Sequence, residues 1–212
     1  MTHHEAIETY ILQHMDEESD YLKALYRQAH LKLINPRMTS GHLQGRLLKM
    51  LVQLARPKRV LEIGTFAGYS ALCMAEGLGE GALLHTYEID DELEDFTRPW
   101  IENSPYGDKV HFHIGNALEE VPHLGEVFDF VFMDGDKRQY MEYYEMILRH
   151  TSSGALILAD NTLWDGHVVD KAYLNDRQTV AINEFNAFVA TDKRVEKLIL
   201  PLRDGLTMIR KK

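Results

Sequence analysis

The chain has 212 residues and a formal net charge of −10, with 45% apolar and 26% charged residues. This length predicts one domain with a substantial core, and the negative charge gives no overall attraction to nucleic acid or to anionic membranes. A single cysteine, Cys73, excludes an intrachain disulfide, and because neither a bilayer-spanning apolar run nor a secretory pattern is evident, we expect a cytoplasmic protein without membrane association.

The first part of the chain has the apolar spacing of amphipathic helices. Helices are predicted over His4–Met15 and Ser19–Ile34, and they end at Asn35-Pro36 because a residue before proline resists the helical conformation. A third helix is predicted from Gly41 to Arg56. We interpret residues 1–37 as an N-terminal helical extension of a single domain that spans residues 1–212.

After Pro57 the pattern changes to alternating strands and helices, which predicts a mainly parallel sheet with right-handed crossovers. The predicted strands are Arg59–Ile63, Leu83–Glu88, Val110–Ile114, Phe128–Met133 and Ala155–Ala159. The predicted helices are Tyr69–Leu78, Asp91–Asn103, Ala117–Val121 and Arg138–His150.

The end of the chain departs from this alternation. A helix predicted from Arg177 to Ala190 precedes two strands, Val195–Leu200 and Leu206–Arg210, which only a short turn separates. Such strands form a hairpin, so the last strand should run antiparallel. The sequence therefore predicts an α/β fold with a mostly parallel seven-stranded sheet, an antiparallel last strand and N-terminal helices.

Oxygen-bearing side chains follow two of the predicted strands. Asp134 comes directly after one buried strand, and Asp160 and Asn161 come directly after the next. Ligands of open α/β sheets bind beyond the carboxyl ends of the strands, so these three side chains should surround one small volume. Such donors suit Mg²⁺, Ca²⁺ or Mn²⁺ rather than Zn²⁺. Lys137 follows Asp134 closely, at a position suited to a general base.

A glycine-containing turn joins the first predicted strand to the helix after it. Gly64 lets the backbone approach a ligand closely, and Gly68 opens the helix. Glu88 ends the second strand, where a carboxylate accepts hydrogen bonds from a ribose diol. The glycine spacing differs from that of the dinucleotide fingerprint, and Glu62 would repel a pyrophosphate. The pattern favours S-adenosylmethionine, a sulfonium cofactor with an amino-acid tail, over a nicotinamide dinucleotide.

Taken together, these motifs resemble the cation-dependent O-methyltransferase family, which includes catechol O-methyltransferase, the caffeoyl-CoA O-methyltransferases and bacterial relatives. The resemblance extends from about Met38 to Thr207 and implies a Rossmann-like class I methyltransferase fold. Gly135 and Asp136 resemble the caffeoyl-CoA branch, whereas the loop Trp164–Tyr173 has its own sequence. The motifs that carry the resemblance are Glu62–Ser70, Asp134–Lys137 and Asp160-Asn161.

The resemblance implies a cofactor site by position. Glu88 would hold the ribose, Ala117 would lie against the adenine, and Met38 and Ser40 belong to a segment that closes over the cofactor. Asp136 would contact the cofactor or acceptor, or cap the following helix. The positions assigned to the cofactor site are Met38, Ser40, Glu62, Gly64, Thr65, Ser70, Glu88, Ala117, Asp134 and Asp136.

The resemblance also implies the chemistry. Asp134, Asp160 and Asn161 match the metal ligands, with Mg²⁺ as the first choice and Ca²⁺ or Mn²⁺ as alternatives. Lys137, with Asp134 beside it, matches the catalytic position and would take the proton from the hydroxyl that is methylated. The expected acceptor is a small catechol-like or other vicinal-diol molecule, because a cation that binds two neighbouring hydroxyls stabilises the attacking oxyanion.

Three alternatives remain open at this point. The same chemistry could act on a hydroxylated tRNA base of the 5-hydroxyuridine type, against which the acidic net charge is a weak argument, because a local basic patch would suffice. A non-catalytic cofactor-binding protein is disfavoured by the intact acids and Lys137, and a nicotinamide dehydrogenase by the glycine spacing. The resemblance also implies a homodimer, with the N-terminal helices near the interface or the active-site mouth.

Overall fold

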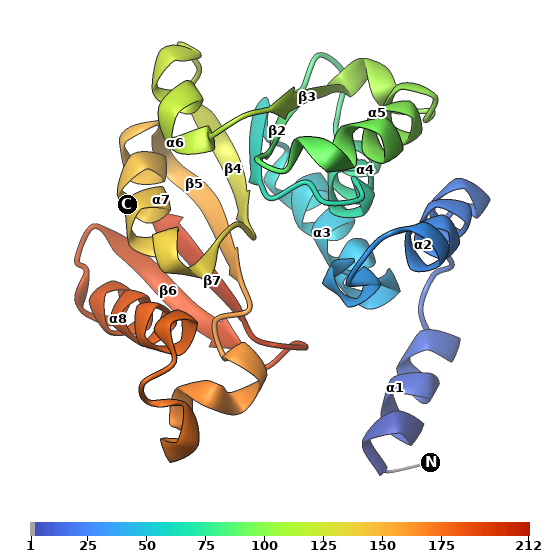
Figure 1. Cartoon of the computed structure of the whole chain (residues 1–212). Helices are drawn as coiled ribbons and strands as arrows, with labels where there is room; N and C mark the ends of the chain where they lie inside the picture. Colours follow the sequence, from blue (N-terminus) through green and yellow to red (C-terminus); the bar gives the residue numbers. More distant parts are fainter. Residues whose placement is uncertain (1–2) are drawn as a thin grey trace.

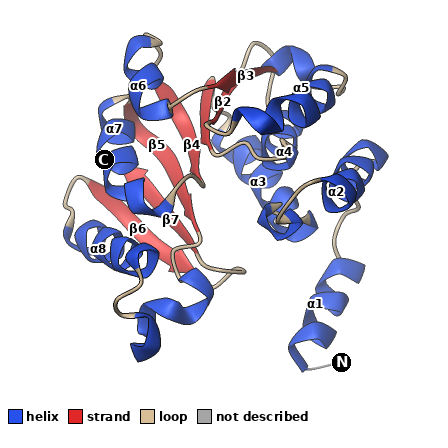
Figure 2. Cartoon of the chain, in the orientation of Figure 1, coloured by secondary structure: helices blue, strands red, loops and turns tan. Residues whose placement is uncertain are grey.

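The computed structural model describes residues 3–212, and this part of the chain forms one seven-stranded sheet flanked by helices (Figures 1 and 2). In the strand order β3-β2-β1-β4-β5-β7-β6, strands β1 to β5 are parallel, and β7 runs antiparallel to both of its neighbours. The predicted topology, with its antiparallel last strand, is confirmed. The strands are β1 (Arg59–Ile63), β2 (Leu83–Glu88), β3 (Val110–Ile114), β4 (Phe128–Met133), β5 (Thr151–Asp160), β6 (Val195–Leu200) and β7 (Leu206–Lys211).

Helices cover both faces of the sheet, which gives three layers. One face packs against α6, α7 and α8, and the other packs against α2 to α5. The helices are α1 (His3–Gln13), α2 (Asp20–Lys32), α3 (His42–Ala55), α4 (Tyr69–Gly77), α5 (Glu94–Glu102), α6 (Ala117–Glu120), α7 (Tyr140–Arg149) and α8 (Arg177–Thr191).

Alternation along the strands divides the core between the two faces. In β1, Leu61 and Ile63 belong to the apolar cluster under α6 to α8, whereas Val60 belongs to the cluster under α2 to α5. Glu62 lies on the same side as Val60 by this alternation, and it is fully buried. Both faces of the central strands are therefore covered, as expected for a parallel sheet.

Strand β5 is longer than predicted. It begins at Thr151 rather than at Ala155, and its pairing with β4 shifts register between Phe128 and Phe130. The added residues include Ser153 and Gly154, which are exposed. The hydrophobic pattern missed this part of the strand because exposed polar residues carry no apolar signal.

Helix α1 stands apart from the sheet and its covering helices (Figure 1). Its apolar side chains Ile7, Tyr10 and Ile11 are 47%, 61% and 37% exposed. Among the described residues, no helix has both the length and the apolar character needed to cross a membrane.

Three histidines stack at the outer parallel edge of the sheet. The His85 ring lies 4.9 Å from that of His111 and 5.4 Å from that of His113, and its Nδ1 is 3.1 Å from His113 Nε2. Burial, together with the two neighbouring histidines, lowers the pKa of His85 to about 4, although Glu126 acts in the opposite direction. The fold therefore holds His85 as a neutral ring.

This burial predicts a pH-dependent loss of stability. The folded-state pKa of His85 is lower than its value in an unfolded chain, so the unfolded state binds the extra proton as the pH falls from about 6.5 towards 4. Between pH 7 and pH 4.5, the wild type should lose about 2 kcal/mol of unfolding free energy relative to a His85→Leu variant. Urea titrations of both proteins measure this difference, and parallel pH profiles would contradict it. Comparing the two proteins cancels the contribution of Glu62, whose raised pKa acts in the opposite sense.

Candidate functional site

A cavity of about 620 Å³ lies beyond the carboxyl ends of β1, β2, β4 and β5. This edge of the sheet is where α/β proteins of this topology bind ligands. Its wall includes Gly64 after β1, Glu88 at the end of β2, Asp134 after β4, and Asp160 and Asn161 at the end of β5. The structure therefore brings the two predicted halves of the site together in one cavity.

Gly64 determines how closely the first and fourth strand ends approach each other. Its φ of +98° is a conformation that side-chain-bearing residues rarely adopt. A Cβ at this position would meet the carbonyl oxygen of Asp134, with the carbonyl carbon only 2.8 Å away. The Asp134 amide also donates a 2.8 Å hydrogen bond to the Ile63 carbonyl. Glycine is therefore required here by both backbone conformation and space.

Lys137 is held at the cavity wall by two oxygen atoms. Its Nζ donates to Asp134 Oδ1 at 2.6 Å and to the hydroxyl of Tyr140 at 2.8 Å. Tyr140 is fully buried and donates in turn to the Asp160 carbonyl at 2.8 Å, with the Met133 carbonyl at 3.2 Å. Burial, followed by the nearby Asp134, holds the pKa of Tyr140 well above its usual value, so this hydroxyl remains protonated. Tyr140 thus ties Lys137 to the ends of β4 and β5.

Asp160 is a buried carboxylate with one orienting donor on each oxygen. Gln44 Nε2 donates to its Oδ2 at 2.5 Å, and the backbone N–H of Asn161 donates to its Oδ1 at 2.9 Å. Burial raises the pKa of Asp160, and the neighbouring Asp134 raises it further. Met133 and Ala159 are register partners, so the two acids directly follow paired residues.

The donor set fits a hard divalent cation. The carboxylates of Asp134 and Asp160 repel each other, and Asp134 raises the pKa of Asp160. A bound cation would relieve this repulsion. Asn161 adds an amide oxygen, and its φ of +56° places it in the left-handed conformation that asparagine tolerates. Among the described residues, no group of three or more His, Cys, Asp or Glu side chains forms a metal site. The predicted trio reaches three donors only through the Asn161 amide.

Glu88 is fixed by backbone amides at the other side of the cavity. Its Oε2 accepts from the N–H of Phe66 at 2.7 Å, and its Oε1 accepts from the N–H groups of Ile89 and Asp90 at 2.9 and 3.0 Å. These bonds occupy three of the roughly four acceptor positions of a carboxylate and leave one on Oε2. The side chain is thus pre-oriented towards the cavity that it lines.

Four of the predicted cofactor residues lie behind the cavity wall. Ser40, Glu62, Thr65 and Ser70 are buried, and none is part of the lining. Glu62 Oε2 accepts from Thr86, and the nearby Ser70 hydroxyl also favours the charged form, although no donor among the described residues lies in full hydrogen-bond geometry to Oε1. Burial raises the pKa of Glu62 to about 8. Glu62 directly precedes Ile63 and Gly64 in the sequence, and both of those residues line the cavity.

The remaining predicted residues line the cavity directly. Met38 is 60% exposed, and Ala117 opens α6 at the opposite wall. Asp136 also lines the cavity, and it caps the short helix that begins at Lys137 by accepting from the Arg138 N–H at 3.0 Å. The Arg138 guanidinium lowers the pKa of Asp136. The capping interpretation is thus confirmed.

Several residues of the site carried no recognised signal in the sequence. Tyr140 follows Lys137 at helical spacing, a pattern that would have indicated contact between them. Gln44 lies on α3 and contacts Asp160 only through the tertiary fold, so no local pattern reveals it. Further lining residues to which the sequence assigned no role are Arg37, Phe66, Tyr87, Ile89, Gln139, Tyr143, Arg203 and Asp204.

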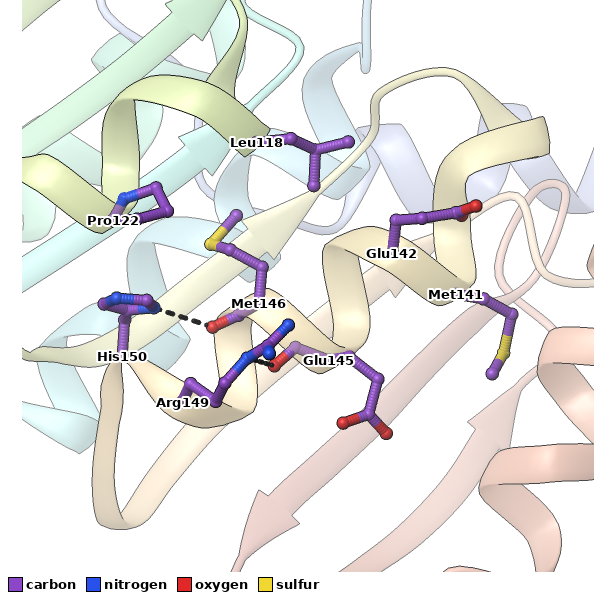
Figure 3. A pocket seen from close by; sticks show the side chains of 8 residues that line it. All are labelled: Leu118, Pro122, Met141, Glu142, Glu145, Met146, Arg149 and His150. Atoms are coloured by element: carbon purple, nitrogen blue, oxygen red, sulfur yellow. Dashed lines mark hydrogen bonds between the residues drawn. The ribbon is translucent and has the colours of Figure 1, made fainter.

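A second hollow, of about 710 Å³, lies on the outer side of α7 (Figure 3). Two of its polar side chains bond backbone within their own helical turn: His150 Nδ1 donates to the Met146 carbonyl at 2.9 Å and Arg149 Nε to that of Glu145 at 3.1 Å. None of its lining residues belongs to a strand end, so we assign the functional site to the first cavity. The lining consists of Leu118, Pro122, Met141, Glu142, Glu145, Met146, Arg149 and His150.

Comparisons with known proteins identify the family. A family model described as O-methyltransferase matches residues 12–212. Caffeoyl-CoA O-methyltransferase of Petroselinum crispum is 35% identical over 185 residues, which cover 82% of this chain and 77% of that protein. The O-methyltransferase of Bacillus cereus, solved in complex with SAH, has a TM-score of 0.90 and 29% identity, and the match covers 98% of this chain and 97% of the other. The O-methyltransferase TomG of Streptomyces achromogenes, solved with SAM, has a TM-score of 0.91 and 27% identity over all of both chains.

The sheet order and the cavity at its carboxyl edge define a class I, S-adenosylmethionine-dependent methyltransferase. More narrowly, the chain belongs to the O-methyltransferase family and is an S-adenosylmethionine-dependent O-methyltransferase, similar to the caffeoyl-CoA enzymes.

Proposed function

We propose that this O-methyltransferase holds a divalent cation through Asp134, Asp160 and Asn161 and methylates a hydroxyl of a small catechol-like or vicinal-diol acceptor. The observation that carries the proposal is that these oxygen donors and Lys137 line the same cavity, at the ends of the adjacent strands β4 and β5. Mg²⁺ is the first choice for oxygen ligands, and Mn²⁺ and Ca²⁺ are alternatives.

The contacts of the chain's residues support the roles proposed for them. When bound, the cation would supply Lewis-acid stabilisation of the acceptor's oxyanion. Lys137 Nζ takes the proton from the hydroxyl being methylated, while Tyr140 keeps Nζ at the cavity wall. The short helix after Asp136 and the buried Tyr140 restrict the motion of Lys137, which favours a fixed distance to the acceptor.

The opposite side of the cavity is proposed to bind the cofactor. The free acceptor position on Glu88 suits a ribose hydroxyl, and Ala117 offers a small apolar surface for adenine. The methionine end would lie against Ile63 and Gly64, in front of the buried carboxyl group of Glu62. Met38 would cover the bound cofactor, because it lines the cavity and is largely exposed without it.

The proposal predicts that activity depends on added cation. Removing divalent ions from the purified protein should lower turnover of a catechol substrate by at least 10²-fold, because the oxyanion then lacks its main electrostatic stabilisation. The measurement is methyl transfer to a catechol panel after EDTA treatment, with Mg²⁺, Mn²⁺ or Ca²⁺ restored separately. S-adenosylhomocysteine binding, measured in parallel, shows that the protein is still folded. Full activity in EDTA would refute the role of the cation.

A hydroxylated tRNA base is the alternative acceptor. Arg37, Arg138 and Arg203 line the cavity and would meet the phosphates of an RNA acceptor, although five carboxylates line it too and Arg138 is paired with Asp136. The acceptor panel therefore includes tRNA that carries 5-hydroxyuridine. Methylation of that tRNA, with no turnover of the catechols, would move the assignment from a small molecule to RNA.

We also propose that the protein is a homodimer in which α1 contributes to the interface. The exposed apolar residues Ile7, Tyr10 and Ile11 of the projecting helix support this proposal. Sedimentation at micromolar concentration should show a species of twice 24.5 kDa, and an Ile7→Glu/Ile11→Glu variant should shift towards monomer. A wild-type protein that sediments only at 24.5 kDa would contradict the proposal.

A further inference from the structure

A chain of three polar side chains links the β6–β7 hairpin to the proposed cation site. Arg203 Nη1 donates to Gln44 Oε1 at 3.1 Å, and Gln44 Nε2 donates to Asp160 Oδ2 at 2.5 Å. Gln44 is 1% exposed and Asp160 is 4% exposed, so water does not compete for the bond between them, whereas the exposed Arg203 reaches Gln44 from the surface. Arg203 lies between β6 and β7 in the left-handed conformation, with a φ of +48°.

The two hydrogen-bond partners of Gln44, Arg203 and Asp160, fix the orientation of its side-chain amide. Its oxygen faces a guanidinium, which only donates, and its nitrogen faces a carboxylate, which only accepts. A flipped amide would oppose donor to donor and acceptor to acceptor. Arg203 and Asp160 together therefore hold the Gln44 amide with its N–H towards Asp160.

Arg203 also holds the segment proposed to cover the cofactor. Its Nη1 donates to the Thr39 carbonyl at 3.3 Å, and its Nη2 donates to the Arg37 carbonyl at 3.4 Å. These two carbonyls flank Met38, which lines the cavity. One guanidinium thus contacts both the covering segment and the amide that orients Asp160.

We propose that Gln44 and Arg203 are positioning residues that couple cofactor binding to cation binding. Closure of the Met38 segment over the cofactor would fix the carbonyls that hold Arg203, and Arg203 would then hold Gln44 against Asp160. This inference rests on the proposed function, because it requires a cation at Asp160. Coupling of this kind is reciprocal, so the cation must strengthen cofactor binding by the same factor.

Both residues are expected to influence cation affinity, although neither contacts the cation. Partners that orient a metal ligand typically contribute 10–100-fold to metal affinity. Gln44→Met removes the donor to Asp160 and should weaken Mn²⁺ binding by about tenfold or more. Arg203→Met leaves Gln44 in place but removes the tie to the covering segment, so it should chiefly abolish the coupling.

The test measures Mn²⁺ affinity with and without S-adenosylhomocysteine. Electron paramagnetic resonance of free Mn²⁺ gives the dissociation constant without any turnover. In the wild type, S-adenosylhomocysteine should raise Mn²⁺ affinity by about fivefold or more, and in Arg203→Met this gain should fall close to one. Arg210→Met is the matched control, because Arg210 is an exposed arginine of the same hairpin whose ion pair, to Glu196, lies outside the cavity. It should keep the wild-type gain.

The outcomes separate this inference from the proposed function. A wild type that binds no Mn²⁺ would refute the cation proposal itself, before any variant is compared. A wild type that binds Mn²⁺ without a gain from S-adenosylhomocysteine, or an Arg203→Met variant that retains the gain, would overturn the coupling alone. Arg203 is exposed, so its variant tests the inference even if Gln44→Met fails to fold.

Discussion

Replacing Lys137 by alanine is expected to lower kcat by about 10²–10⁴-fold while S-adenosylhomocysteine affinity stays close to that of the wild type. Lys137 Nζ reaches the cavity between Asp134 and Tyr140, on the side opposite Glu88, so its loss removes a proton acceptor without disturbing the proposed ribose contact. The measurements are steady-state methyl transfer and calorimetric titration with S-adenosylhomocysteine.

Lys137→Arg distinguishes a base from a structural cation. Arginine retains the positive charge beside Asp134 but does not give up its proton in proteins. If Lys137 acts as a base, the arginine variant should be nearly as slow as the alanine variant. Recovery of most of the activity with arginine would show that only the ion pair with Asp134 matters, and wild-type turnover in Lys137→Ala would remove the residue from the mechanism.

Gly64→Ala is expected to lower the unfolding free energy by roughly 3 kcal/mol and to weaken cation binding by at least tenfold. The new Cβ would press on the Asp134 carbonyl, whose residue supplies a proposed cation ligand. The positive φ adds strain because alanine rarely adopts it. Urea unfolding and Mn²⁺ titration measure the two effects.

The Gly81→Ala variant is a control that separates the effect of backbone strain from the effect of a steric clash. Gly81 also has a positive φ, +71°, but a Cβ there meets no atom within 4 Å. It should therefore lose only about 1 kcal/mol and bind Mn²⁺ like the wild type. Equal losses in the two variants would show that backbone strain, rather than the approach of β1 to β4, makes Gly64 necessary.

The inner strands β1, β2 and β4 were predictable because they are buried on both faces and end abruptly. Strands β1, β2, β3, β4 and β6 have the predicted bounds, since their apolar runs are bounded by polar or turn residues. The start of β5 was not predictable, because Ser153 and Gly154 face solvent and resemble a loop.

The candidate site was predictable where it depends on strand ends and not where it depends on packing between distant segments. Asp134, Asp160 and Glu88 reach the cavity because the ends of parallel strands share one edge. Sequence distance hides the contact of Gln44 with Asp160, which are 116 positions apart. Spacing along the chain placed Glu62 near the cofactor, but it does not reveal that this side chain lies behind the wall.

The left-handed backbone conformation of Asn161 restricts which residue types can occupy this position. Glycine would adopt a φ of +56° readily but would supply no oxygen atom, whereas glutamine would supply the oxygen but disfavour the conformation. Aspartate satisfies both demands but would add a negative charge next to Asp160 and against Asp204, whose carboxylate accepts from the Asn161 amide at 3.5 Å. If the proposed cation site is correct, residue 161 should therefore tolerate few substitutions. A change of metal preference would then more easily come from other residues of the cavity wall.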